Sequence, residues 1–213
     1  MPAHNSEIHA FIRSQIVSGH LKPGDMIDET ALSDRFNVSK TPIREAILQL
    51  EAASVLERRP RAGAYVATLN INAMIELIEM HSELEGAAAY HAARRGTPAQ
   101  IRALQRAGDA YETAVNAQAS DVYDRNLAFH MAVFAACNNM TLQREIDATG
   151  VRLVAYFRAQ EGVRTGQGRA LAEHSAIFAA IRDGRADDAR AAMRRHAEIA
   201  SDTLLDVLAL MRG

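Results

Sequence analysis

Three histidines in the second half of the sequence have the residue type and the spacing for metal coordination. His130 follows Asn126 by four positions, so the two side chains share one face of a helix and can point at one atom. His174 and His196 lie on separate helical segments, far enough apart for an antiparallel helical hairpin to bring them together. Three converging imidazoles suit a transition metal such as zinc. Scattered histidines are more often surface or hydrogen-bonded core residues, and spacing alone leaves that alternative open.

A second set of chemical groups lies in the first half, in the run SKTPIREAILQL at residues 39–50. Lys40, Thr41 and Arg44 fall at the start of this run. They supply cations for phosphates, a threonine for phosphate or thymine, and an arginine fork for guanine. Cations on a short helix are often only a solvated face, so the interpretation depends on the elements around them.

Those elements form an ordered series. Apolar spacing predicts a first helix over residues 8–16, and Asp28 can cap a short second helix. In the third helix the Ser39 hydroxyl can cap exposed amide groups, and Pro42 fits the first turn, where a missing N–H costs little. One face of this helix is apolar, which leaves the other face available to a partner.

A basic β-hairpin is expected after the third helix. The run LERRPRAGAYV places a proline and Gly63 between two short stretches that favour β-strands. Arg58, Arg59 and Arg61 would lie along the DNA backbone or in the minor groove. Three helices and a hairpin make a winged helix-turn-helix, which we assign to residues 1–68.

From Ile71 onward every strong periodic signal is helical. The breaks between helices fall at residues 96–98, 138–139, 161–169 and 183–184, which are rich in Gly, Pro and Asn or loosely polar. The predicted fold class is therefore mainly α. A winged helix-turn-helix precedes an all-α bundle of six or seven helices at residues 69–213.

The composition narrows the function further. The formal net charge is -2, so the chain as a whole offers no large basic field, and any DNA contact must come from a local patch. Cys137 is the single cysteine, which excludes an internal disulfide. The sequence shows neither a signal-peptide pattern nor an apolar run long enough to cross a bilayer, so we expect a cytoplasmic protein without a membrane partner.

Residues 18–66 resemble the DNA-binding domain of the GntR family of bacterial transcription regulators. The family pattern G-x-L-x-P-G followed by V-S-R-T-P-V-R-E-A-L is matched by Gly19, Leu21, Pro23, Gly24 and the run 38–47. Lys40 stands where the family more often has arginine, which replaces a planar fork by a point charge. The resemblance assigns DNA contacts to Lys40, Thr41, Pro42, Arg44 and the wing residue Gly63, with Thr30 as a weaker candidate.

Residues 71–208 resemble the FadR-type effector domain, also called the FCD domain. That domain commonly holds a metal through an Asp-x-x-x-His pair and two later histidines. By resemblance, the ligands here are Asn126, His130, His174 and His196. Asn126 occupies the position usually filled by aspartate, so the site keeps only a neutral carbonyl oxygen there and is weakened. Zinc is the expected divalent metal, and nickel is an alternative.

The run HSELE at residues 81–85 departs from the family as well. The family often shows Arg-x-x-Leu-Glu there, and the arginine frequently meets a ligand carboxylate. His81 takes its place, so it is our candidate effector contact, and an organic acid becomes a less secure effector. A purely structural role for His81 is an equal alternative.

These features together predict a ligand-responsive bacterial transcription regulator rather than an enzyme. The resemblance favours a repressor that binds a palindromic double-stranded DNA operator as a homodimer, with a small-molecule effector in the helical domain. One alternative is a metal-dependent hydrolase that uses the three histidines, with Glu173 as general base. Another is a DNA-binding protein whose effector pocket is degenerate.

Overall fold

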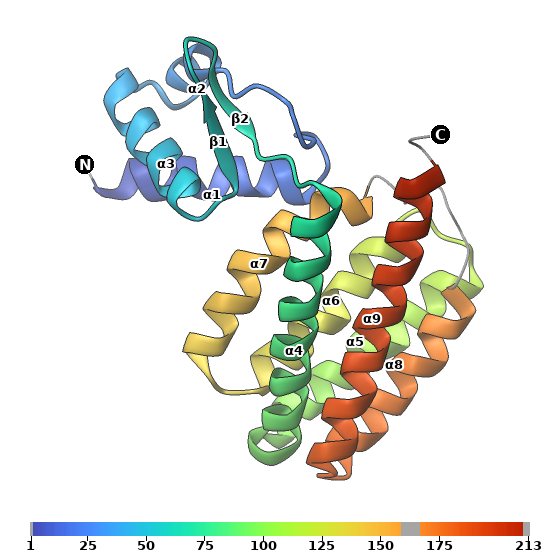
Figure 1. Cartoon of the computed structure of the whole chain (residues 1–213). Helices are drawn as coiled ribbons and strands as arrows, with labels where there is room; N and C mark the ends of the chain where they lie inside the picture. Colours follow the sequence, from blue (N-terminus) through green and yellow to red (C-terminus); the bar gives the residue numbers. More distant parts are fainter. Residues whose placement is uncertain (1, 159–166, 211–213) are drawn as a thin grey trace. The chain divides into compact units, whose positions relative to one another are not determined.

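A computed structural model describes residues 2–158 and 167–210. The chain consists of helices and one β-hairpin, and it divides into two compact units (Figure 1). The first unit runs to Met74 and also includes the part of a later helix that begins at Ala148. The second unit holds Ile75–Asp147 and the described residues from 167 onward. The predicted class is confirmed: the protein is mainly α, with a winged helix-turn-helix followed by a helical bundle.

The first unit contains three helices and the hairpin in the predicted order. These elements are α1 (Pro2–Val17), α2 (Glu29–Phe36), α3 (Lys40–Ala52), β1 (Leu56–Arg59) and β2 (Gly63–Val66). Ile12 of α1 and Ile47 of α3 are fully enclosed in one apolar core, because α3 packs against α1, α2 and β1. The apolar spacing in the sequence therefore identified the buried face of each helix correctly.

Local side-chain and backbone contacts set the start of α2 and the turn between α2 and α3. The Asp28 carboxylate accepts hydrogen bonds from the backbone N–H groups of Thr30 and Ala31, both at 2.9 Å, which confirms the predicted cap. Asn37 ends α2 in the left-handed region, with φ of 50°. Ser39 occupies the N-cap position of α3, but its side chain makes no capping hydrogen bond. That expectation was wrong, because the hydroxyl is exposed and water can take its hydrogen bonds.

The predicted hairpin is confirmed as an antiparallel pair in which Leu56 faces Val66 and Arg59 faces Gly63. Gly63 has φ of 102°, a conformation that favours glycine. The sequence therefore has a glycine at the position of the wing turn where the backbone needs one. The segment before α2 extends the sheet by a bridge between Met26 and Tyr65. The wing is therefore held by backbone hydrogen bonds on two sides.

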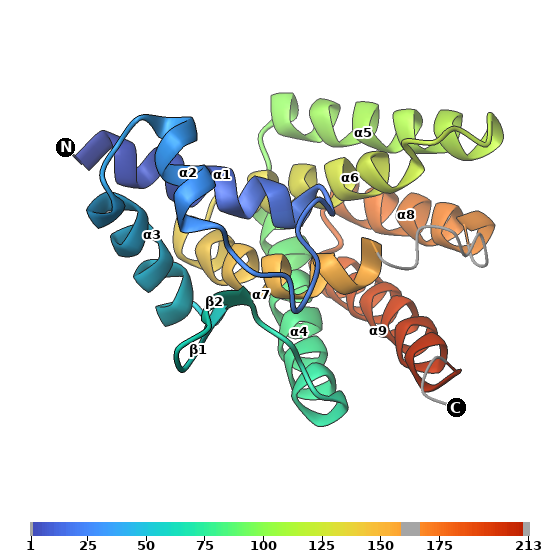
Figure 2. The ribbon, with the colours of Figure 1, turned by 90° about the horizontal axis from the view of Figure 1, so that it is seen from above.

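The second unit is a helical bundle whose core contains both small and large apolar side chains. The helices that belong to it, wholly or in part, are α4 (Ile71–Arg95), α5 (Pro98–Asn116), α6 (Val122–Ala136), α7 (Met140–Arg158), α8 (Gln167–Arg182) and α9 (Ala186–Leu210). Within the described ranges these are six helices, as predicted. Helix α5 lies beside α6 and α8, and α8 pairs with α9 (Figure 2). Phe129, Ile177 and Met193 are fully buried between them.

The start of α5 and the connection between α8 and α9 follow their sequence signals. Thr97 and Gln100 form a reciprocal capping box, with Pro98 in the first turn of α5. Gly184, with φ of 71°, lies between α8 and α9. None of the helices in the described ranges combines the length and the apolar character that a membrane span requires.

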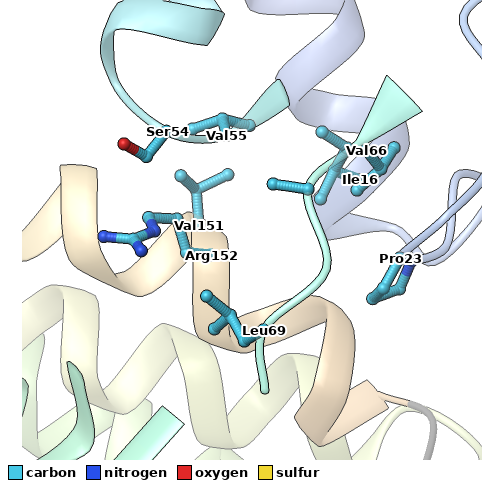
Figure 3. A pocket seen from close by; sticks show the side chains of 9 residues that line it. Ile16, Pro23, Ser54, Val55, Val66, Leu69, Val151 and Arg152 are labelled. Atoms are coloured by element: carbon cyan, nitrogen blue, oxygen red, sulfur yellow. The ribbon is translucent and has the colours of Figure 1, made fainter. Parts of the chain in front are cut away.

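The end of α7 belongs to the core of the first unit, which no sequence signal indicated. Val151 is buried in that core, and the Leu69 backbone N–H donates a hydrogen bond to the Tyr156 hydroxyl at 2.6 Å. A cavity of about 10 Å³ lies beside Val151 and Arg152 (Figure 3). That volume suffices for roughly one water molecule, so the cavity is too small for an effector.

Candidate functional site

The three histidines of the bundle converge on one point, as the sequence predicted. The Nε2 atom of His196 lies 3.1 Å from Nε2 of His130 and 3.2 Å from Nε2 of His174. One ring nitrogen from each residue falls within 4.8 Å of the others. All three side chains are buried, at 9%, 2% and 5% exposure for His130, His174 and His196. They come from α6, α8 and α9, and the pairing of α8 with α9 brings the last two together.

Aromatic packing sets the plane of His174. Its ring stacks on Phe129 with centroids 4.0 Å apart and an interplanar angle of 13°. The ring of Tyr111 lies 4.7 Å away. Burial and the charge of Glu173 raise the pKa of Tyr111 to about 12, so its phenol stays protonated. His174 is thus held by packing, and its buried Nδ1 atom has no hydrogen-bond partner in the part of the chain that the structure describes.

Two carboxylates lie behind the other two rings. The Oε2 atom of Glu173 is 2.8 Å from Nδ1 of His196. The Oε1 atom of Glu85 is 3.2 Å from Nδ1 of His130 and 3.4 Å from Nε2 of His81. Both contacts at Glu85 are close, and the one at His130 does not have the geometry of a hydrogen bond. Each carboxylate therefore faces the ring nitrogen opposite the shared centre.

Sequence reasoning missed Glu85 and gave Glu173 a different role. Two features of the sequence could have indicated these contacts. Glu85 follows His81 by four positions, and Glu173 is adjacent to His174. The structure places Glu173 against Nδ1 of His196, away from the Nε2 atoms where a bound water would lie. It is therefore not placed as the general base that a hydrolase would need.

Burial keeps two of the imidazoles neutral. Removal from water lowers the pKa of His174 far below its ordinary value, and the neighbouring His130 and His196 lower it further. The pKa of His196 is also lowered by burial and by His130, and Glu173 opposes this only in part. A neutral imidazole presents a lone pair, which is the form that binds a metal.

The carboxylate behind His130 is ionised. Burial by itself would raise the pKa of Glu85, but His130 and His81 outweigh it and hold the pKa well below its ordinary value. A charge this deeply buried needs partners, and the two imidazoles supply them. The cluster thus combines neutral nitrogen donors with a fixed negative charge behind one of them.

The nitrogen donors fit a divalent metal. Zinc–nitrogen bonds of about 2.0–2.1 Å place two nitrogens of a tetrahedral site roughly 3.3 Å apart. The observed separations from His196, 3.1 and 3.2 Å, are close to that value. Facing lone pairs at this distance repel unless a proton or a cation lies between them. The donor set and its spacing therefore fit a bound cation, and they fit N–H···N hydrogen bonds between the rings as well.

The two remaining predicted residues of the bundle lie nearby but are less clearly placed. Asn126 is half-buried on α6, one turn before His130, and the described residues record no hydrogen bond of its side chain. His81 lies on α4, with its side chain 15% exposed, against Glu85. Ligation by Asn126 and effector contact by His81 stay predictions.

The predicted DNA contacts lie on the open side of α3 and on the wing. Lys40, Thr41 and Arg44 are exposed, Pro42 is half-buried in the first turn, and Thr30 is exposed at the start of α2. The Nε group of Arg44 donates a hydrogen bond to Glu29 at 3.1 Å, which the sequence did not indicate. These positions suit contact with a groove, and contact itself stays a prediction.

Arg59 and Arg61, two of the wing cations predicted to contact DNA, have different surroundings. Arg59 donates to Glu57 at 2.7 Å and lies over the ring of Tyr65, 4.1 Å from its centroid. Arg61 is exposed at the turn, where its φ is 63°. One cation of the wing is therefore held in place, and the other extends from the tip beside Gly63.

Two known families match the chain. The FCD domain family matches residues 76–198, more than half of the chain, and the family described as bacterial regulatory proteins, gntR family, matches residues 5–66. The chain belongs to the GntR family, with an FCD domain. The recognition made from the sequence is confirmed.

Relatives of this GntR protein match it over nearly the whole length. The HTH-type transcriptional regulator LutR of Bacillus subtilis is 27% identical over 212 residues, covering 89% of this chain and 95% of LutR. The HTH-type transcriptional repressor RspR of Escherichia coli is 25% identical over 211 residues, covering 95% of this chain and 90% of RspR. The solved structure of E. coli McbR/YncC has a TM-score of 0.84 at 20% identity, covering 96% of this chain and 98% of that one, and it supports the fold.

The GntR and FCD families contain transcription regulators, and the names of these relatives describe them as transcription regulators too. The protein is accordingly a DNA-binding transcription regulator and not an enzyme, as the sequence predicted. The hydrolase alternative loses its support from family and from the placement of Glu173 alike.

Proposed function

We propose that this GntR regulator is a ligand-responsive repressor that binds a palindromic operator as a homodimer. The observation that carries the DNA-binding part is the division of α3. Its apolar face is fully buried, as at Ile43 and Ile47, while Lys40, Thr41 and Arg44 remain exposed at its start. A helix with this division can enter the major groove without loss of its core. The repressor named RspR supports the direction of regulation.

Dimerisation follows from the limited charge of one reading unit. The chain carries a formal net charge of -2, and the predicted DNA contacts on α3 and the wing include only a few cations. Few phosphate contacts give weak and salt-sensitive binding. Two copies across a two-fold operator double the contacts and add sequence information, which is the usual arrangement for such domains.

The test is selection of duplexes from a random library by the full-length protein, followed by sedimentation of the complex. We expect an enriched palindrome and a complex of two chains per duplex. Enrichment of no sequence, or a single chain on each duplex, would contradict the operator and the dimer.

For the bundle, we propose that His130, His174 and His196 hold a divalent metal, with Asn126 as an additional oxygen donor. Zinc is the first expectation and nickel the alternative. Such a metal supplies a Lewis-acidic centre to which oxygen atoms of an effector, such as an organic acid, can bind. The support is the convergence of three buried Nε2 atoms at separations that suit a metal.

Metal analysis of protein purified without added metal tests this site. Each single change of His130, His174 or His196 to alanine should lower the bound metal, and Asn126→Asp should bind it more tightly than the natural chain. Metal content equal to that of the natural chain in all three alanine variants would reject the ligand set. Unaltered melting temperature with every metal and carboxylate tried, with DNA binding intact, would instead indicate a regulator with a degenerate pocket.

A further inference from the structure

We propose that Glu85 and Glu173 are positioning residues of the histidine cluster. Each carboxylate faces the Nδ1 atom of one imidazole, His130 for Glu85 and His196 for Glu173, and holds that ring with its proton on Nδ1 and its Nε2 lone pair toward the shared centre. The tautomer part of this proposal depends only on the geometry. Its consequence for metal affinity rests on the proposed metal site.

The pair of Glu173 and His196 is the clearer one. Its oxygen-to-nitrogen distance is 2.8 Å, and the histidine is 5% exposed. An ionised carboxylate can only accept a hydrogen bond, so the proton between the two groups lies on Nδ1. The other ring nitrogen is then a lone pair, and it is the atom that approaches both of the other histidines. Arg169, 3.5 Å from the same carboxylate, helps to hold it in place.

The pair of Glu85 and His130 uses a carboxylate shared between two rings. Glu85 is 6% exposed and lies within 3.4 Å of His130 Nδ1 and His81 Nε2. The contact to His130 lies within hydrogen-bond distance, although its geometry is not that of a hydrogen bond. Because His81 contacts the same oxygen, it restrains the carboxylate as well. The residue predicted as an effector contact is thereby linked to a proposed metal ligand through a single side chain.

His174 provides an internal comparison. Among the described residues its buried Nδ1 atom has no hydrogen-bond partner, and its ring is fixed by stacking on Phe129. Removal of Glu85 or Glu173 should therefore alter the tautomer of one histidine each and leave His174 unchanged. A general loosening of the bundle would affect all three rings.

The two carboxylates also matter for charge. Asn126 and three neutral imidazoles bring no formal charge to a dication. Glu85 and Glu173 place negative charge directly behind two of the donors, which raises the basicity of the imidazoles. These carboxylates thus supply negative charge beside a donor set that carries none of its own.

The deciding experiment is a long-range nitrogen–proton correlation on full-length, histidine-labelled protein from which metal has been removed. In the natural sequence we expect His130 and His196 as Nδ1–H tautomers, with their Nε2 atoms farther apart than 3.1 Å, because no cation then separates the two lone pairs. Glu173→Ala should convert His196 to the Nε2–H form that a free imidazole prefers, and Glu85→Ala should do the same for His130. Glu173→Gln keeps an acceptor oxygen and should keep the tautomer. An Nε2–H form of His196 in the natural protein, or no response to Glu173→Ala, would overturn the proposal.

Zinc affinity, measured by competition with a chelator, tests the consequence. Each alanine variant should raise the dissociation constant about 10- to 100-fold. Glu83→Ala is the matched control, because Glu83 is an exposed carboxylate on the same helix that pairs with Arg194 instead. If even the natural chain binds neither zinc nor nickel, the proposed metal site fails, and the tautomers still decide the positioning role. An unchanged affinity in both alanine variants of a zinc-binding chain would overturn the consequence for metal.

Discussion

Replacement of Arg44 by alanine is the sharpest test of the reading helix. The side chain is 62% exposed at the start of α3, and its Nε atom lies 3.1 Å from Glu29. In the free protein the guanidinium is thus held by a carboxylate, while most of its surface remains open. We expect Arg44→Ala to weaken operator binding and to flatten sequence preference, because a bidentate contact to guanine is lost.

The magnitude follows from a comparison of two interactions. An ion pair as exposed as that of Arg44 and Glu29 contributes about 0.2–1 kcal/mol to folding. A good bidentate pair between arginine and guanine contributes about 1–3 kcal/mol of discrimination. The base contact therefore exceeds the ion pair. Operator affinity should fall roughly 5- to 150-fold, and the free energy of unfolding should change by less than about 1 kcal/mol.

Fluorescence anisotropy with the selected operator and with a scrambled duplex of equal composition measures this effect at one fixed salt concentration. Arg106→Ala is the control, because it removes one exposed cation from α5 in the bundle. It should leave the ratio of the two affinities unchanged. If Arg44→Ala weakens both duplexes equally, or neither, the assignment of Arg44 to base readout is refuted.

Three further changes test the fold around these sites. Phe129→Ala should lower the free energy of unfolding in urea by about 3–5 kcal/mol, since the ring is fully buried against His174; a loss below 1 kcal/mol would contradict its place in the core. Gly63→Ala should destabilise by about 1 kcal/mol or more, because φ is 102° while the space around it is open; a neutral result would mean that the wing turn relaxes. Ser39→Ala should change the thermal midpoint by less than 1 °C or so, because no capping hydrogen bond is lost; a drop of several degrees would show that the cap forms in solution.

The first unit could be predicted well because its signals are local. The apolar period identified the buried faces, and Asp28 and Gly63 marked a helix start and a turn that the structure contains. The cap of Ser39 failed for a physical reason. Residue type shows which side chain can cap a helix, but competition with water decides whether it does.

Contacts between helices were harder to predict. The spacing of His174 and His196 suggested a helical hairpin, and their convergence followed from it. The positions of Glu85 and Glu173 behind the rings depend on helix register and rotamer, which composition does not encode. The same limit applies to Val151, because a helical period shows that a face is buried but not which core receives it.

A carboxylate holds a basic side chain both at the reading helix, where Glu29 holds Arg44, and in the histidine cluster, where Glu173 holds His196. The two contacts differ in strength because the two basic side chains differ in solvent exposure. Arg44 is 62% exposed, so its bond to Glu29 is weak, screened by salt, and exchangeable for a phosphate or a base. His196 is 6% exposed at its side chain and Glu173 21%, so water competes less for their bond than for that of Arg44, and the bond should persist. Raised salt should therefore weaken operator binding steeply while the tautomer of His196 stays the same. An equal loss of both would mean that the cluster is accessible to solvent, and the positioning role of Glu173 would then have no physical basis.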